Sequence, residues 1–382
     1  MRVLVVNAGS SSLKLRVLDA ADRVTSTADL PAPAGTADDA ALASALAGLG
    51  PADAAGFRVV HGGTSFTAPV RIDAGVLARL HALADLAPLH QPKSLAAVAA
   101  VQRALPGLPG VACFDTAFHA SLPAAAATYA LPREWRQRWA LRRYGFHGLS
   151  HSYCSRRAAE LVAAGEGGTA RAGDTAGASR IVTCHLGAGA SLAAVRDGVS
   201  VDTTMGFTPL EGLVMATRSG TVDPGLVLWL AEHAGTPVAE LAATLEHRSG
   251  LAGLAGTADM RAVVTAAAAG EPDARLALDV YLHRLRAGIA AMTAALGGLD
   301  VLAFTGGVGE NSPEVRAGAA AGLGFLGVGL DPARNASGDG PDRDIGDSSA
   351  RVRSFVIAAR EDIEIAGQVR AVLGGGSSPP VS

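Results

Sequence analysis

The chain has 382 residues and a formal net charge of −3, and 18% of its residues are charged while 49% are hydrophobic. A charge this small, without a polybasic run, excludes an electrostatic surface for nucleic acid or an anionic membrane, so we expect small-molecule chemistry. The length favours two domains, and because no window approaches about 18 uninterrupted apolar residues, no transmembrane helix is predicted.

The N-terminal residues Met1–Asn7 carry one charge and an apolar run that is too short for a signal peptide. We interpret this run as a strand of the folded protein instead of a signal peptide. We therefore predict a cytoplasmic enzyme. The three cysteines show no C-x-x-C spacing for zinc or redox chemistry, so we interpret them as buried free thiols. They are Cys113, Cys154 and Cys184.

The first predicted elements are an apolar strand over Val3–Val6, a polar turn, and a strand over Leu13–Leu18 in which apolar residues alternate. The sequence of the turn is Asn7-Ala-Gly-Ser-Ser-Ser-Leu-Lys14. Serine and glycine are default turn formers. However, three hydroxyls, an amide and a lysine on one tight turn favour phosphate or metal coordination.

Four more segments before residue 152 place polar side chains at strand ends or beside glycines. Each is a weak signal alone, because a single arginine or histidine in such a place is more often salt-bridged or structural. The segments are Arg58-Val-Val-His-Gly-Gly63, Pro88-Leu-His90, Phe-Asp115-Thr-Ala-Phe-His119 and Tyr144-Gly-Phe-His147-Gly-Leu-Ser-His151.

The segment Ile181–Val195 repeats the plan of the N-terminal hairpin: an apolar strand, a glycine turn and a second strand. Gly187 and Gly189 in this turn tolerate positive φ and leave backbone N–H groups open to an anion. Two such hairpins, about 180 residues apart, predict an internal duplication. The irregular segment that follows carries Arg218, and such backbone is where binding groups often collect.

A third glycine-rich signal follows the apolar run Leu299–Phe304, where the sequence continues Thr305-Gly-Gly-Val-Gly-Glu-Asn311. We expect a glycine turn there. Ser312 as N-cap, Pro313 at the first position and Glu314 in the first turn then predict a helix start. A helix N-terminus beside glycines favours anion binding.

Helical spacing of apolar residues recurs between these landmarks, and strands that alternate with helices indicate an α/β fold. Two segments rich in Gly, Ala and Asp, 164–179 and 335–350, are expected to be surface loops, and 374–382 to be disordered. The predicted helices are Asp39–Leu49, Ala74–Leu86, Pro92–Ala104, His151–Ala164, Gly225–His233, Val238–Leu245 and Arg275–Leu296, the last with Leu276, Val280, Leu285, Ile289 and Met292 at helical spacing.

Together, these side chains supply what phosphoryl transfer needs. Lys14, Arg58 and Arg218 can spread negative charge, Asp115 can serve a metal ion or a proton, and glycine turns can bind phosphates.

The motifs resemble those of the acetokinase family over nearly the whole chain. Besides the segments above, the resemblance rests on His185-Leu-Gly-Ala-Gly189, Gly-Phe-Thr-Pro209-Leu-Glu-Gly, Thr-Arg218-Ser-Gly and Phe-Thr-Gly-Gly-Val-Gly-Glu-Asn-Ser312, in the family's order. It implies an α/β fold of two duplicated ribonuclease-H-like domains, of the acetate and sugar kinase, Hsp70 and actin superfamily, with an interdomain active-site cleft. The domains would be 1–119, with 363–382 packing back on it, and 120–362, which binds the nucleotide.

The resemblance also implies the activity: reversible phosphoryl transfer between ATP and acetate, giving acetyl phosphate and ADP by direct in-line transfer. The implied cofactor is Mg²⁺, with Mn²⁺ as the alternative, and members are typically homodimers. The implied roles are catalysis by Asp115, His147 and Arg218, metal binding by Asn7 and Glu361, and substrate binding by Arg58, Val60, Leu89, Phe146 and Pro209. The implied ATP-binding residues are Lys14, His185, Leu186, Gly187, Ala188, Gly189, Asp259, Met260, Arg261, Gly307, Val308, Gly309, Glu310 and Asn311.

A carboxylate substrate needs no general base, because an unperturbed carboxylic acid titrates near pH ~4–5 and is ionised at neutral pH. We therefore expect Asp115 to position substrate or metal-bound water more than to move protons. Four segments depart from the family pattern. Ala188 replaces a frequent asparagine, which leaves only backbone contacts to phosphate, and Ala359-Arg-Glu361-Asp replaces Thr-Asn/Asp-Glu-Glu, which weakens the case for Glu361. The other two are Pro88-Leu-His-Gln-Pro-Lys-Ser94, in place of Pro-Leu-His-Asn-Pro-Ala-Asn, and Asp259-Met260-Arg261, in place of an Asp-Phe-Arg-like segment.

Two alternatives remain open. A propionate or other short-chain acyl kinase would differ by about one methylene in an apolar pocket, which shifts discrimination by only ~1–3 kcal/mol. A non-catalytic, chaperone-like ATPase of the same superfamily would need neither an apolar pocket nor Arg58 and Arg218 facing a γ-phosphate.

Overall fold

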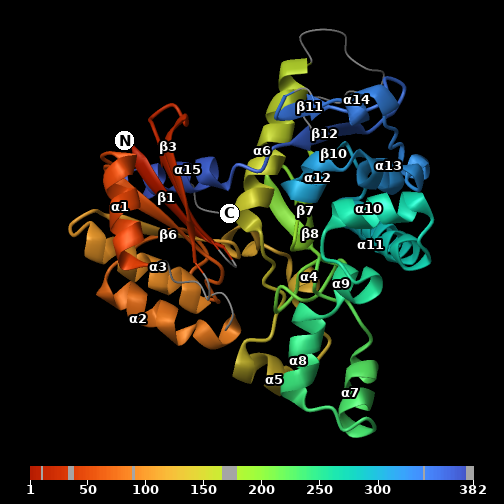
Figure 1. Ribbon diagram of the computed structural model, residues 1–382, viewed down its shortest axis with the longest axis horizontal. Helices are drawn as coiled ribbons and strands as arrows, with labels where there is room; N and C mark the ends of the chain where they lie inside the picture. The colour runs from red at the N-terminus through yellow and green to blue at the C-terminus, as the bar shows by residue number, and fades with distance from the viewer. Residues whose placement is uncertain (10–11, 33–37, 88–90, 166–178, 339, 376–382) are drawn as a thin grey trace. The chain divides into compact units, whose positions relative to one another are not determined.

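The computed structural model describes residues 1–382 except 10–11, 33–37, 88–90, 166–178, 339 and 376–382. Its internal contacts divide the chain into two compact units (Figure 1). Unit 1 comprises 1–121, 146–153 and 360–382, and unit 2 comprises 122–145 and 154–359. The predicted domain limits, 1–119 with 363–382 and 120–362, differ from this division chiefly at 146–153, which packs with unit 1.

Unit 1 is built on a six-stranded sheet with the strand order β3-β2-β1-β4-β6-β5. Strands β1, β4 and β6 run parallel, while β2, β3 and β5 each run antiparallel to a neighbour. The parallel strands are buried on both faces, which explains their continuous apolar sequences. The strands are β1 Val3–Ala8, β2 Ser12–Leu18, β3 Val24–Pro31, β4 Ala54–Val59, β5 Val70–Arg71 and β6 Gly110–Phe114.

Unit 2 repeats this sheet. Its strand order is β11-β12-β10-β7-β8-β9, which matches that of unit 1 strand for strand when read from the other edge, with the same pattern of parallel and antiparallel pairs. Even an irregularity recurs: the outer hairpin shifts register at Val17/Leu18 in unit 1 and at Ala194/Val195 in unit 2. The predicted duplication is therefore confirmed. The strands are β7 Arg180–Leu186, β8 Ala190–Arg196, β9 Val199–Thr203, β10 Val301–Thr305, β11 Asp342–Asp344 and β12 Arg353–Ile357.

Helices cover both faces of the first sheet. Helices α1 and α3 bury apolar side chains against one face, and α15, at the far end of the chain, packs on the other against β1, β4 and β6. Asp38 and Asp73 cap α1 and α2 by accepting from the N–H three residues on, which fixes where these helices begin. The helices are α1 Asp39–Leu49, α2 Ala74–Ala82, α3 Gln91–Ala104 and α15 Glu361–Leu373, with 3₁₀ turns η2 Ala84–Leu86 and η3 Ala117–His119.

In unit 2 the long helix α11 packs against β7, β8 and β9 and against α9, α10 and α13. Helix α6 (Gly148–Gly165) begins in unit 1 and continues into unit 2. The other helices are α4 Ala124–Ala127, α5 Arg133–Trp139, α7 Pro224–Glu232, α8 Val238–His247, α9 Gly250–Ala255, α10 Met260–Ala269, α11 Pro272–Leu296, α12 Gly306–Asn311, α13 Pro313–Ala321 and α14 Pro332–Ala336, with a 3₁₀ turn η4 Gly324–Leu326.

All seven predicted helices are present, and the helix start at Ser312 is confirmed because its side chain accepts from Val315 N. Two local predictions were wrong. The expected glycine turn at 306–311 is the short helix α12, and the expected loop 335–350 contains strand β11. Leu276, one of the apolar residues at helical spacing in α11, is 55% exposed. Most of the loop expected at 164–179, and 376–382 of the expected disordered tail, lie outside the described residues.

All three cysteines are free and buried, as predicted. In the part of the chain that the structure describes, no helix is long and apolar enough to cross a membrane.

Candidate active site

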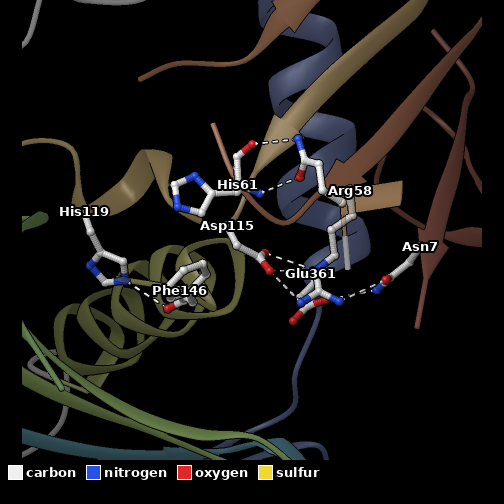
Figure 2. Close-up of polar contacts among 8 residues, drawn as sticks. Asn7, Arg58, His61, Asp115, His119, Phe146 and Glu361 are labelled. Carbon is white, nitrogen blue, oxygen red and sulfur yellow. Dashed lines mark hydrogen bonds and ion pairs between the residues drawn. The ribbon is translucent and has the colours of Figure 1, made fainter. Parts of the chain in front are cut away.

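Unit 1 brings four predicted site residues together at the carboxyl ends of its parallel strands (Figure 2). Arg58, at the end of β4, donates from Nη2 to Asp115 Oδ2 (2.6 Å) and from Nε to both Asp115 oxygens (3.1 Å each). Arg58 Nη1 donates to Asn7 Oδ1 (3.2 Å). Asn7 Nδ2 in turn donates to Glu361 Oε2 (3.1 Å), which lies 3.9 Å from Arg58 Nε. One guanidinium is thus surrounded by two carboxylates and an amide.

Burial governs the charges of this cluster. Asp115 is 1% exposed and the side chain of Arg58 17%. Burial raises the pKa of Asp115, although Arg58 opposes the shift and the Glu361 charge adds to it. Burial also disfavours the charged Arg58, but Asp115 and Glu361 outweigh this effect and hold the pKa of Arg58 above its ordinary value. Arg58 therefore presents a permanent cation to an anionic ligand.

Unit 1 also holds two residues of the predicted acyl pocket. Val60 and Phe146, both predicted to contact the acyl methyl, are buried, and the ring of Phe146 meets that of His61 edge-on, with ring centroids 5.5 Å apart. Phe146 O is 3.1 Å from His119 Nε2, which donates to it. Burial lowers the pKa of His61 and of His119 to about 4, so both rings are neutral at physiological pH.

His147 has an uncommon backbone conformation. Its φ of 55° lies in the left-handed region, which costs a residue other than glycine on the order of 1 kcal/mol. The next residue, Gly148, donates its N–H to Asp115 O (2.8 Å), and a Cβ on Gly148 would lie only 2.1 Å from that oxygen. The chain around His147 is therefore held tightly against the backbone of Asp115.

Unit 2 contains a cavity of 440 Å³, which falls within the usual range of small-molecule sites, about 300–1,000 Å³. It lies where β7 and β10, adjacent parallel strands, end in glycines. Eight of the predicted ATP-binding residues line it: Gly187, Ala188, Asp259, Met260, Arg261, Gly307, Val308 and Asn311. The remaining lining residues are Ala216, Leu251, Ala258, Tyr281 and Ser312.

Two predicted ATP-binding acids direct their carboxylates to backbone N–H groups. Glu310 Oε1 accepts from Gly306 N and Ala359 N (3.0 Å each), so it joins the ends of β10 and β12. Asp259 caps α10 by accepting from Arg261 N (2.9 Å). These contacts give both acids a structural role, and of the two only Asp259 lines the 440 Å³ cavity.

Arg218 lies in unit 2, in the irregular segment between β9 and α7, and is half-buried. Its Nη1 donates to Pro209 O (3.3 Å), which links two predicted site residues. Burial lowers the pKa of Arg218, and Glu246 opposes the shift.

The other predicted site residues have simpler surroundings. Lys14 is exposed on β2, directly opposite Asn7 in register. His185 and the buried Leu186 end β7, and the turn that follows is closed by a hydrogen bond from Gly187 N to Gly189 O (3.0 Å). Leu89 lies outside the described residues.

Comparison with known proteins identifies the family. The sequence matches the acetokinase family over residues 46–367. The chain belongs to this family. It is 44% identical to the acetate kinase of Leifsonia xyli subsp. xyli over 404 residues, which cover 98% of this chain and 99% of that protein.

Two solved structures of similar proteins agree with the family assignment. The acetate kinase of Porphyromonas gingivalis is 34% identical, with a TM-score of 0.86 over 97% of this chain and 99% of that one. A propionate kinase from Francisella tularensis subsp. tularensis is also 34% identical, with a TM-score of 0.85 over 96% and 98%. The fold is therefore the duplicated one of this superfamily, and the protein is a kinase that uses ATP and ADP.

The unit 1 cluster offers oxygen ligands of the kind that suit a magnesium ion. Glu361 and Asn7, the two predicted metal residues, are in contact and supply carboxylate and amide oxygens. Mg²⁺ is commonly bound through one or two carboxylates, with substrate phosphates and water in its other positions, so this donor set fits. Groups of three or more His, Cys, Asp or Glu suited to a metal are absent from the described residues.

Sequence reasoning missed residues that support the acetokinase site. Gln91 holds the chain after β4, because its Nε2 donates to His61 O (3.0 Å) and its Oε1 accepts from His61 N (3.2 Å). In unit 2, Glu211 accepts from Tyr129 OH (2.5 Å) and Arg143 Nη2 (2.8 Å). Glu211 lies in the quoted Gly-Phe-Thr-Pro-Leu-Glu-Gly motif, and an acid inside a glycine-bounded loop could have suggested such an anchor.

Proposed function

We propose that this acetokinase catalyses reversible phosphoryl transfer between ATP and acetate, giving acetyl phosphate and ADP by direct in-line transfer. One observation carries the proposal: the permanently charged Arg58, whose side chain is 17% exposed, shares unit 1 with the buried apolar Val60 and Phe146, and Val60 follows it by two residues. A short fatty acid has the matching two ends, a carboxylate and a methyl group. The names of the relatives support the same substrate.

Each unit contributes groups to the reaction in this proposal. Arg58 binds the carboxylate, and Asp115 fixes the guanidinium through its bidentate contact. The 440 Å³ cavity of unit 2 binds the nucleotide, with the glycine-rich segments at Gly187 and Gly307 near the phosphates. His147 and Arg218 stabilise the charge of the transferred group, as cationic or donor side chains do in phosphoryl transfer. Pro209 and Leu89 keep the substrate-binding role that the family resemblance implies.

Asn7 and Glu361 would hold Mg²⁺, with Mn²⁺ as the alternative. The ion, when bound, would neutralise phosphate charge. Lys14, on the strand opposite Asn7, would contribute a further cation.

We also propose that the protein forms a homodimer. Large apolar side chains are exposed on α5, α7 and α8 of unit 2, among them Trp139 (49%), Leu228 (61%) and Trp229 (52%). Monomers rarely expose such groups together, so we place the dimer surface there. Separately, we propose that the protein is cytoplasmic.

The decisive experiment compares kcat/KM for acetate, propionate and butyrate with ATP, using hydroxamate formation to detect the acyl phosphate. We expect acetate to be preferred. A higher value for propionate would favour the second candidate, a propionate kinase, which the structural similarity to the Francisella enzyme suggests. The absence of any acyl phosphate with all three acids would refute both and leave the non-catalytic ATPase.

A further inference from the structure

A buried arginine lies behind α12, the helical turn Gly306–Asn311 that we call the nucleotide turn. Arg316, on α13, is 1% exposed. Its Nη1 donates to Gly309 O and Glu310 O (2.9 Å each), the carbonyls near the end of the nucleotide turn. Its Nε and Nη2 donate to Asn335 Oδ1 (2.7 Å) and Asn335 O (2.6 Å). One guanidinium therefore ties the nucleotide turn to α14.

A second arginine reaches the same carbonyl. Arg343, on β11, donates from Nη2 to Glu310 O (3.3 Å) and from Nη1 to Gly340 O (3.3 Å). Glu310 O thus receives two cationic donors. Positive groups are favourable at this position, because the last carbonyls of a helix carry partial negative charge, and hydrogen bonds from charged donors are stronger than neutral ones.

Placing two guanidinium groups close together, one of them buried, costs electrostatic free energy. Among the described residues, no carboxylate forms an ion pair with either guanidinium, whereas buried charges are usually paired. Burial and the neighbouring Arg343 lower the pKa of Arg316 to about 10, with Glu314 opposing the shift. The nearest acids are committed elsewhere: Glu310 to two backbone N–H groups and Glu314 to Ser312 Oγ (3.1 Å). The guanidinium of Arg316 therefore donates its hydrogen bonds to backbone carbonyls and to the side chain of Asn335.

The two arginines do not face the nucleotide cavity. They line a separate cavity of 320 Å³, while Gly307 and Val308 line the 440 Å³ cavity and Asn311 lines both. A nucleotide would therefore meet one side of the turn and the guanidinium groups the other.

We propose that Arg316 and Arg343 are positioning residues that hold the nucleotide turn in the conformation that receives the phosphates of ATP and ADP, without touching the nucleotide. This inference rests on the proposed function, because it takes the 440 Å³ cavity as the nucleotide site. It assigns a role to two residues that no motif in the sequence indicated.

The test uses Arg343→Gln, which removes two hydrogen bonds, and Arg316→Lys, which keeps the charge but loses the forked geometry. We expect the KM for ATP and the calorimetric Kd for ADP to rise about tenfold, as loss of charged hydrogen bonds implies. The KM for acetate and the Kd for adenosine should not change, because adenosine carries no phosphate. The matched control is Arg351→Gln, since Arg351 also donates to carbonyls, Leu326 O (2.6 Å) and Leu299 O (3.4 Å), but lines neither cavity.

Equal weakening of ADP and adenosine would overturn the inference, as that result means general damage to unit 2. Unchanged ADP binding in Arg343→Gln and Arg316→Lys would overturn it too. Because binding is measured without turnover, a wild-type protein that binds ADP but phosphorylates no acid would refute only the proposed function.

Discussion

At the scale of single residues, the site depends on how one cation is held. Arg58 has a carboxylate on one side, Asp115, and an amide on the other, Asn7, so its guanidinium has little freedom to turn. A fixed guanidinium binds a carboxylate with little loss of entropy, which is the general advantage of a preorganised site. Asp115 is buried and accepts three hydrogen bonds from Arg58, whereas Asn7 accepts one, so Asp115 is the stronger constraint.

Asp115→Asn tests whether this residue positions or transfers protons. Asparagine keeps one acceptor for Arg58 but removes the charge, and breaking a buried pair costs about 3–5 kcal/mol. We expect kcat/KM for acetate to fall by roughly two to three orders of magnitude, with the pH profile of the remaining activity unchanged in shape. Thermal unfolding of the variant, measured alongside, separates loss of the site from loss of the fold. A lost limb in the pH profile would show instead that Asp115 moves a proton.

At the scale of elements, the first turn of α6 is fitted against the strand end that carries Asp115. The N–H of Gly148 bonds to Asp115 O, and no Cβ can be accommodated there. By contrast, Gly367 in the exposed middle of α15 has no atom within 4 Å of an added Cβ. A side chain is therefore excluded at Gly148 but has free space at Gly367.

Alanine at these two positions should act in opposite directions. Gly148→Ala forces α6 away from Asp115 and should lower the free energy of unfolding by about 1–3 kcal/mol, as overpacking does. Gly367→Ala should raise it by up to about 1 kcal/mol, because alanine is the better helix former. Urea unfolding curves of both variants measure the two effects, and activity should fall only in Gly148→Ala. A stabilised Gly148→Ala protein would contradict the close fit described here.

At the scale of the whole molecule, local sequence patterns predicted the duplicated hairpins but not the contacts between residues that are far apart in the sequence. The two hairpins at Val3–Leu18 and Ile181–Val195 were visible because alternation and glycine turns are local signals. The two-residue strand β5 and three-residue β11 carry no such pattern, and their pairing comes from tertiary contacts. The contact of Asn7 with Glu361 spans 354 residues, so only family resemblance could suggest it. No sequence pattern indicated the two hydrogen bonds between the Gln91 side chain and the backbone of His61.

The buried histidines should make the stability of the protein depend on pH. The pKa of His61 and of His119 is about 4 in the folded chain, against about 6.5 when unfolded. Between these values the unfolded chain binds more protons, so the free energy of unfolding rises with pH and is lost as pH falls from about 6.5 towards 4. Each histidine should contribute about 3 kcal/mol of this change.

Urea midpoints measured at pH 7.5, 6, 5 and 4.5 check this, with the wild type compared with His119→Gln, which keeps a donor for Phe146 O. Carboxylates also titrate in this range, and burial raises the pKa of Asp115, which gives it the opposite sign: its contribution to stability falls as pH rises. The difference between wild type and variant removes these shared terms, so the variant should lose stability less steeply on acidification. Parallel curves would mean that the pKa of His119 is the same in the folded and the unfolded chain and that its buried environment is not the cause of the acid sensitivity.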